Sequence, residues 1–205
     1  MAVEEPSFKT IVREGAFEVR DYPALVVAEV TVSGDQKEAA SKGFRLLAGY
    51  IFGGNKRRQS IAMTAPVAQA PTSEKIAMTA PVIQSPAGEK IAMTAPVLQT
   101  GGDGTWVIRF IMPRGSTLDT LPRPNNPNVQ LHALAAERLA VVRFSGLARQ
   151  DDVAARTLAL SRFVVTQHFL AIGQPSLAQY DPPWTLWFMR RNEMMIPVAP
   201  AAGAK

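Results

Sequence analysis

The sequence predicts an α+β protein, rich in antiparallel strands and built from two β-α-β-β halves. Two observations predict this fold. Segments that alternate apolar and polar residues recur along the chain, and this period of two is typical of half-buried strands. The order of strand, Ser-Gly turn and helical pattern occurs twice, with the turns at Ser33-Gly34 and Ser145-Gly146. We therefore expect one domain over residues 8–198, with halves at about 8–112 and 128–198.

The first half centres on its helix. Ser33 followed by Gln36 fits a capping box at the start of this helix. Strand patterns precede and follow this helix in the sequence, so we expect the strands on either side of it to join one sheet. The expected elements, in order, are strands at 8–13, 16–22 and 26–32, a helix at about 35–52, and strands at 60–67 and 105–112.

The second half repeats this order after a loop at 113–127 that is rich in proline and asparagine. Asp151 is the expected N-cap of its helix, and His168 is expected inside that helix. His132 lies in a strand pattern beside Leu131. The remaining expected elements are strands at 139–144, 176–181 and 184–189, followed by a disordered tail at 199–205.

The heptapeptide Ile-Ala-Met-Thr-Ala-Pro-Val occurs three times, at 61–67, 76–82 and 91–97. Each copy alternates like a strand, and its proline places it at or near a sheet edge because proline cannot donate to the ladder. The methionines at the shared position are Met63, Met78 and Met93. We expect them to pack in the barrel interior, although a thioether is also a ligand for a soft metal or for haem iron.

Composition excludes several classes of protein. The 205 residues include no cysteine, which excludes thiolate nucleophiles and cysteine-ligated metals. No apolar run approaches the roughly 18 residues of a membrane span, and the first ten residues lack the apolar region of a secretory signal. Absence of cysteine favours a reducing compartment, so we expect a cytoplasmic protein.

The net charge is +5, yet the basic residues are scattered and form no dense stripe with interleaved aromatics. We therefore expect no nucleic-acid partner. The charge indicates either a solvated basic surface or attraction of an anionic small ligand.

The helix at 35–52 carries a wider apolar arc than a surface helix needs. At about 100° per residue, one face should cover the sheet, and a second group of apolar residues falls beyond its edge. Either neighbouring loops cover this second group, or it forms a wall for a flat apolar ligand, with Arg45, Lys42 or Lys56 near the acidic edge of that ligand. The sheet-facing residues are Ala39, Gly43, Leu46, Leu47 and Tyr50, and those beyond the edge are Phe44, Ala48 and Phe52, toward Ser41 and Arg45.

Several segments together resemble one family, the SOUL haem-binding proteins, over about residues 8–198. The segments are Phe17-Glu18-Val19-Arg20-Asp21-Tyr22-Pro23, Ser33-Gly34, Gly43-Phe44, Gly53-Gly54-Asn55, Lys90-Ile91-Ala92-Met93-Thr94-Ala95-Pro96-Val97, Phe144-Ser145-Gly146, Tyr180-Asp181-Pro182-Pro183-Trp184 and Arg190-Arg191-Asn192-Glu193. The resemblance implies an α+β fold: a distorted antiparallel β-barrel of about eight strands, built from two pseudo-symmetric β-α-β-β halves with two helices packed outside. It also implies a shallow apolar groove beside the first helix that binds haem or another tetrapyrrole.

The resemblance places this groove at Ser41, Phe44, Ala48 and Gly49, beside which lie Arg45 and Phe52. Some members of the family are thought to use an axial histidine at the place that Asp21 occupies here. A carboxylate is a poor match for that role. The resemblance therefore implies a tetrapyrrole bound without a strong axial histidine, and no metal ligand is assigned.

Three functions remain open at this point. The first is a non-covalent carrier or buffer of haem or a related tetrapyrrole. The second is an enzyme acting on a tetrapyrrole or another small substrate in the same groove, with Asp21, Glu29 and Glu193 as acidic candidates. The sequence offers no paired nucleophile and base, so an enzyme is the weaker expectation. The third is a protein-interaction module that uses the repeated strands edge to edge.

Overall fold

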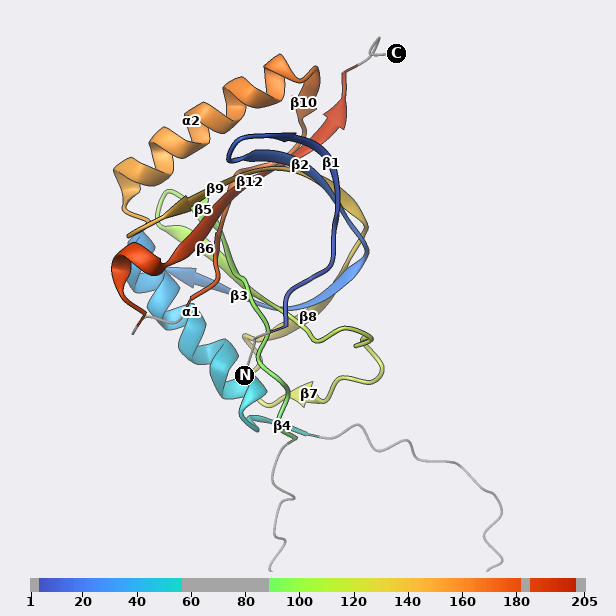
Figure 1. The fold of residues 1–205 in the computed structure, drawn as a ribbon. Helices are drawn as coiled ribbons and strands as arrows, with labels where there is room; N and C mark the ends of the chain where they lie inside the picture. Colours follow the sequence, from blue (N-terminus) through green and yellow to red (C-terminus); the bar gives the residue numbers. More distant parts are fainter. Residues whose placement is uncertain (1–3, 57–88, 182–184, 202–205) are drawn as a thin grey trace, which may run out of the picture.

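The computed structural model describes residues 4–56, 89–181 and 185–201 (Figure 1). It contains two α-helices, α1 (Gln36–Ile51) and α2 (Gln150–Thr166), and a short 3-10 helix, η1 (Trp187–Met189). The strands are β1 (Lys9–Glu14), β2 (Phe17–Tyr22), β3 (Leu25–Ser33), β4 (Asn55–Lys56), β5 (Val97–Gly102), β6 (Thr105–Ile111), β7 (Arg123–Pro124), β8 (Gln130–Leu134), β9 (Glu137–Ser145), β10 (Phe169–Ala171), β11 (Ser176–Gln179) and β12 (Arg191–Pro200).

One antiparallel sheet holds most of the strands, in the order β1-β2-β9-β12-β11-β5-β6-β3-β8, and β10 pairs with β12 beside this path. The order β9-β12-β11 in one half matches β3-β6-β5 in the other, and the halves meet where β11 pairs with β5. The strand that precedes each half in the sequence pairs with the other half: β2 precedes β3 but pairs with β9, and β8 precedes β9 but pairs with β3. The predicted pair of pseudo-symmetric β-α-β-β halves is therefore confirmed.

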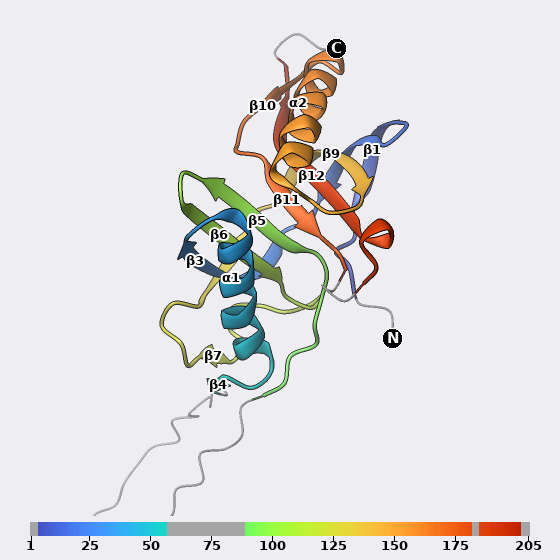
Figure 2. The same ribbon diagram turned by 90° about the vertical axis from the view of Figure 1, so that its left-hand side faces the viewer.

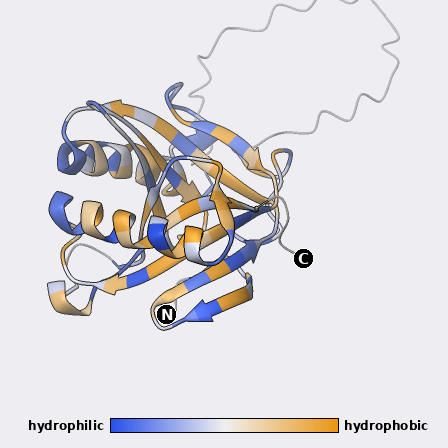
Figure 3. Cartoon of the chain, turned by 90° about the horizontal axis from the view of Figure 1, so that it is seen from above, coloured by the Kyte–Doolittle hydropathy of each residue, from blue (hydrophilic) through white to orange (hydrophobic). Residues whose placement is uncertain are grey.

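The sheet curls into a half-barrel, and both helices lie outside it (Figures 1 and 2). Because successive side chains of a strand point to opposite faces, each strand supplies one row to a helix and one row to the concave face. α1 covers β3 and β6, and α2 covers β9, β10 and β12. Hydrophobic and hydrophilic residues accordingly alternate along the strands (Figure 3). The predicted α+β distorted barrel with two external helices is confirmed.

The N-cap of α1 lies two residues later than the predicted cap, Ser33. The side chain of Asp35, rather than Ser33, accepts a hydrogen bond from the Glu38 backbone N–H at 2.8 Å. A carboxylate at the N-cap also interacts favourably with the helix dipole, which explains why Asp35 takes this role. The predicted sheet-facing side is confirmed, because Ala39, Gly43, Leu47 and Tyr50 are buried and Leu46 packs against the same cluster.

Gly43 is the point of closest approach between α1 and the sheet. A Cβ atom at this position would lie 2.8 Å from the Ile108 Cβ atom and closer still to Cγ1. We expect Gly43→Ala to lower the free energy of unfolding by about 1–3 kcal/mol, because the helix must move away from β6. Gly49→Ala on the same helix is the control: its Cβ would meet no atom within 4 Å, so helix propensity should raise stability by up to about 1 kcal/mol. Urea unfolding curves measure both changes, and equal effects would contradict this packing.

The second helix differs from its prediction at both ends. The residue before its first turn is Arg149, which makes no side-chain cap, and Asp151 lies inside the first turn. There a carboxylate still stabilises the helix through the dipole. The helix ends at Thr166, and His168 follows it with a positive φ of 59°. The expectation that His168 lies within the helix is therefore wrong.

The last strand lies further along the chain than predicted. The sequence predicts a strand at 184–189, whereas Trp187–Met189 forms η1 and the strand β12 runs over Arg191–Pro200. Ala199 and Pro200 pair with β10, so they do not belong to the disordered tail predicted for 199–205. The cause is burial: alternate residues of β12, including Val198, pack against α2. Residues 202–205 lie outside the described residues.

The heptapeptide repeat is described only in its third copy; the copies at 61–67 and 76–82, with the strand predicted at 60–67, lie outside the described residues. In the third copy only Val97 belongs to a strand. Thr94 points inward, where its hydroxyl donates a hydrogen bond to the Ile111 carbonyl. With Thr94 inward, Met93 is directed outward, and it is 39% exposed. The predicted interior position is therefore wrong for Met93.

The residues before the first repeat copy and those before the third copy lie side by side at the C-terminal end of α1. The side-chain amide of Asn55 donates to the Glu89 carbonyl at 2.7 Å, and its oxygen accepts from the Glu89 backbone N–H at 2.8 Å. Two residues on, the Ile91 N–H bonds to the Ile51 carbonyl at 2.9 Å. Residues 55 and 89, which are 34 positions apart, therefore lie together beside the last turn of α1. Among the described helices, none has the length and apolar character that a membrane crossing requires.

Candidate functional site

The residues predicted to bind a ligand lie together on one side of α1. Successive positions three or four apart on a helix share a face, and this spacing brings Ser41, Phe44, Arg45, Ala48 and Phe52 into one row. We call this row, with Gly49, the α1 edge. It borders the face that covers the sheet, so its members range from half-buried to exposed.

The two aromatic rings of the α1 edge differ in burial. Phe44 is half-buried, and its ring packs edge-on against Phe110 of β6, with the centroids 5.3 Å apart. Phe52 follows the last turn of the helix and is 59% exposed. Phe44 is thus held by the core, whereas the described residues leave Phe52 open to solvent.

Two small residues, Ala48 and Gly49, occupy the C-terminal part of the α1 edge. Ala48 is half-buried, and a Cβ atom added at Gly49 would meet nothing within 4 Å. The chain then turns tightly: the Gly54 N–H bonds to the Gly49 carbonyl at 2.8 Å. A Cβ atom at Gly54 would lie 2.6 Å from that oxygen, so the turn requires glycine there. This turn carries the chain away and leaves Phe52 at the surface.

Cationic side chains lie on the polar side of the α1 edge. Arg45 is exposed, and its Nε donates to the Ser41 carbonyl at 3.4 Å. Lys42 on the same helix and Lys56 on β4 are also exposed. A ligand on the α1 edge would therefore meet an apolar surface with positive charge along one side.

The described residues near the α1 edge supply no strong axial ligand for iron. His132 lies on β8 with its Nε2 3.8 Å from a carboxylate oxygen of Glu29, and its neighbour Leu131 faces the α1 cluster instead. His168 follows α2 in the other half. No group of three His, Cys, Asp or Glu residues that could hold a metal ion occurs in the described part of the chain.

Asp21, at the place that the resemblance gives to an axial histidine, is engaged elsewhere. Its two carboxylate oxygens accept hydrogen bonds from Arg138 at 2.6 and 2.9 Å. The hydrogen bond from Arg138 lowers the pKa of Asp21 below its ordinary value. Asp21 lies on β2, and β2 and its neighbour β9 pack with α2 rather than α1, so it is not part of the α1 edge.

A buried polar network occupies the concave face of the sheet. The sequence patterns did not predict that these residues contact one another. Arg20 donates to Glu18 at 2.5 Å, to Glu193 at 2.8 Å and to the Tyr22 hydroxyl at 3.1 Å. The Tyr180 hydroxyl donates to Glu193 at 2.7 Å. The alternation in Phe17–Tyr22 places Glu18, Arg20 and Tyr22 on one face, but the contact with Glu193 spans 173 positions and depends on the sheet order.

This network holds its groups in fixed ionisation states. Burial alone would lower the pKa of the Arg20 guanidinium, but hydrogen bonds to Glu193 and Tyr22 outweigh burial and raise it. Burial, and then the charge of Glu193, raise the pKa of Tyr180. Burial also raises the pKa of Tyr22, against the opposing effect of Arg20. The tyrosines therefore stay neutral at physiological pH.

The carboxylates considered as catalytic candidates are all bound to arginines. Glu29 accepts from Arg109 at 2.6 Å, Glu193 from Arg20, and Asp21 from Arg138. The three ion pairs lie at different places on the sheet, so the structure does not bring these carboxylates together as a catalytic set.

The fold resembles several solved structures at low sequence identity. The C-terminal domain of EcmrR aligns with a TM-score of 0.58 and 11% identity, over 90% of this chain and 98% of that one. A hydrolase from Listeria innocua aligns with a TM-score of 0.55 and 11% identity, over 92% and 94%. These likenesses concern the fold alone. The comparison with curated proteins gave no match.

The family comparison covers almost the whole chain. The model of the family described as SOUL heme-binding protein matches residues 3–197. That range includes both halves of the sheet, both helices and the whole α1 edge. The chain therefore belongs to the SOUL heme-binding protein family.

Proposed function

We propose that the chain binds haem or a related tetrapyrrole non-covalently on the α1 edge, as a carrier or buffer. The observation that carries this proposal is Phe52, a large aromatic side chain left 59% exposed beside the small residues Ala48 and Gly49 and the exposed Arg45. Membership of a haem-binding family supports the ligand class. The assignment to Ser41, Phe44, Arg45, Ala48, Gly49 and Phe52 is our own.

Burial of apolar surface would supply most of the binding energy. Each Å² of apolar surface removed from water contributes about 25 cal/mol, offset by the cost of ordering the ligand. The ring of Phe52 and the surface at Ala48 and Gly49 would contact the macrocycle. Arg45 and Lys42 would attract its propionates, which adds orientation rather than most of the affinity.

A binding site without a strong axial ligand for iron leads to a specific prediction. Haem iron gains its strongest protein contacts from ligands such as histidine or thiolate, and the described residues offer neither at the α1 edge. We therefore expect haem and metal-free protoporphyrin to bind with dissociation constants within about threefold of each other, a difference below about 1 kcal/mol.

Parallel fluorescence and absorbance titrations of haem and protoporphyrin test this prediction. Protoporphyrin binding more than tenfold weaker than haem would show that iron ligation dominates and would contradict the proposed mode. The haem spectrum should also remain unchanged over hours, because a carrier leaves its ligand intact. Progressive loss of the haem absorbance would favour an enzyme.

A further inference from the structure

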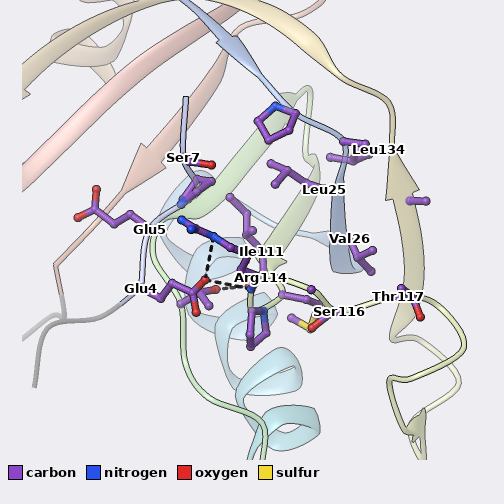
Figure 4. Close-up of a pocket in the computed structure, with 18 of the residues that line it drawn as sticks. Glu4, Glu5, Ser7, Leu25, Val26, Ile111, Arg114, Ser116, Thr117 and Leu134 are labelled. Atoms are coloured by element: carbon purple, nitrogen blue, oxygen red, sulfur yellow. Dashed lines mark hydrogen bonds and ion pairs between the residues drawn. The ribbon is translucent and has the colours of Figure 1, made fainter. Parts of the chain in front are cut away.

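One cavity of the described structure lies away from α1. It has a volume of about 620 Å³ and opens where β3 begins and where β6 and β8 end (Figure 4). No residue of α1 lines it. Its size falls within the roughly 300–1,000 Å³ that is usual for small-molecule sites.

One wall of the cavity is apolar and belongs to the sheet. Leu25 and Val26 come from β3, Ile111 from β6 and Leu134 from β8 (Figure 4). These residues are half-buried or buried. A ligand on this wall would remove apolar side chains from water, which is the main source of affinity in such sites.

The N-terminal segment Glu4–Ser7 forms the opposite wall and is fixed to the fold at both sides. The Glu4 carbonyl accepts from the Ala95 N–H at 2.9 Å, and its carboxylate accepts from the Arg114 N–H at 3.0 Å. Glu5 forms an ion pair with Arg191 at 2.5 Å. These bonds hold the cavity open before any ligand arrives, so binding need not order this wall.

The charges at the rim of the cavity compensate one another. Glu4 lies 4.0 Å from the Arg114 guanidinium, and Glu5 is paired with Arg191. An ion in the cavity would have to compete with these existing partners and lose its own hydration. An uncharged ligand carries neither cost.

The cavity continues toward the concave face of the sheet. A narrow inner pocket of about 30 Å³ shares the lining residues Pro6, Leu25, Ile111 and Leu134 with the main cavity. Its far side is formed by the neutral rings of Tyr22 and Tyr180. Glu137 also lines this inner pocket. The volume of the inner pocket is close to that of about one water molecule, so a ligand would occupy the main cavity beside it.

We propose that this cavity binds an uncharged, mostly apolar small molecule, at a site separate from the α1 edge. Two substitutions place a bulky side chain at the cavity without replacing a core residue: Ala133→Trp on β8 and Ala24→Trp in the β2–β3 turn. Both alanines line the cavity and are exposed. Ala135→Trp is the matched control, because Ala135 is exposed two positions further along and does not line the cavity.

The probe is N-phenylnaphthylamine, an uncharged fluorophore, and its comparison compound is the anionic anilinonaphthalene sulfonate. We expect saturable fluorescence with N-phenylnaphthylamine in the unmodified chain and in Ala135→Trp. Ala133→Trp and Ala24→Trp should each weaken it by about tenfold or more. The sulfonate should bind the cavity at least about tenfold more weakly than the uncharged probe, despite the net charge of +5.

Unchanged binding in both cavity-lining variants, with thermal unfolding like that of the control, would overturn the proposed site. Equal cavity binding of the sulfonate would overturn the assignment to an uncharged ligand. Haem affinity should be the same in Ala133→Trp and Ala135→Trp, and haem should not displace the probe. Haem displacing the probe would show that the two sites are one and would contradict their separation.

Discussion

Replacing Glu193 with alanine is expected to lower the free energy of unfolding by about 3 kcal/mol. Removing one partner of a buried ion pair typically costs about 3–5 kcal/mol, because the other charge stays buried without compensation. Glu193 is 3% exposed and its partner Arg20 is 5% exposed. Arg20 keeps Glu18 at 2.5 Å, so we expect the lower end of this range.

The same network provides the control for this prediction. Arg13 pairs with Glu18 at 2.7 Å, but the Arg13 side chain is 66% exposed. Exposed pairs contribute about 0–1 kcal/mol, so Arg13→Ala should change stability little. Urea denaturation at neutral pH measures both variants. Similar losses in Glu193→Ala and Arg13→Ala would contradict the view that burial makes this network important for stability.

Much of the fold follows from local patterns. The apolar segments at 26–32 and 139–144, each followed by a Ser-Gly turn, predict the strands β3 and β9. The 3.6-residue period of α1 predicts its buried face. The repeated order of strand, turn and helix predicts two similar halves. These signals depend on neighbours in the sequence, so they are readable without the tertiary structure.

The errors arise where distant contacts decide the outcome. The third heptapeptide copy alternates like a strand, but the contact of Thr94 with β6 determines which of its residues point inward. The last strand extends to Pro200, where it pairs with β10 and packs against α2. The pattern near Trp187 resembles a strand, yet that segment forms η1. Local alternation does not report these pairings.

The candidate site was partly readable. Helical spacing predicts that Ser41, Phe44, Arg45, Ala48 and Phe52 share one edge of α1, and the structure places them there. How deeply each of these side chains is buried could not be predicted from the sequence, because the contact of Phe44 with Phe110 depends on packing against β6. The cavity beside Glu4–Ser7 was also missed, since its walls come from segments separated by more than one hundred positions.

Phe52→Glu is expected to weaken haem binding by about tenfold or more, equivalent to at least about 1.4 kcal/mol. The substitution removes an apolar ring from the proposed contact surface and places a negative charge where the propionates approach. Phe52 is 59% exposed, and exposed substitutions usually change stability by less than about 0.5 kcal/mol. Phe44→Glu is a less informative change, because Phe44 also supports the core through Phe110.

Leu158→Glu is the matched control. Leu158 lies on α2 and is 56% exposed, so this variant loses a similarly exposed apolar side chain and gains the same charge. Both variants reduce the net charge by one from +5, which equalises long-range attraction of the anionic ligand.

The haem dissociation constants of Phe52→Glu and Leu158→Glu, measured side by side, test the assignment of the tetrapyrrole to α1 most directly. We predict that Phe52→Glu binds about tenfold or more weakly than Leu158→Glu, while Leu158→Glu matches the unmodified chain. Equal dissociation constants in the two variants would place the tetrapyrrole elsewhere on the molecule.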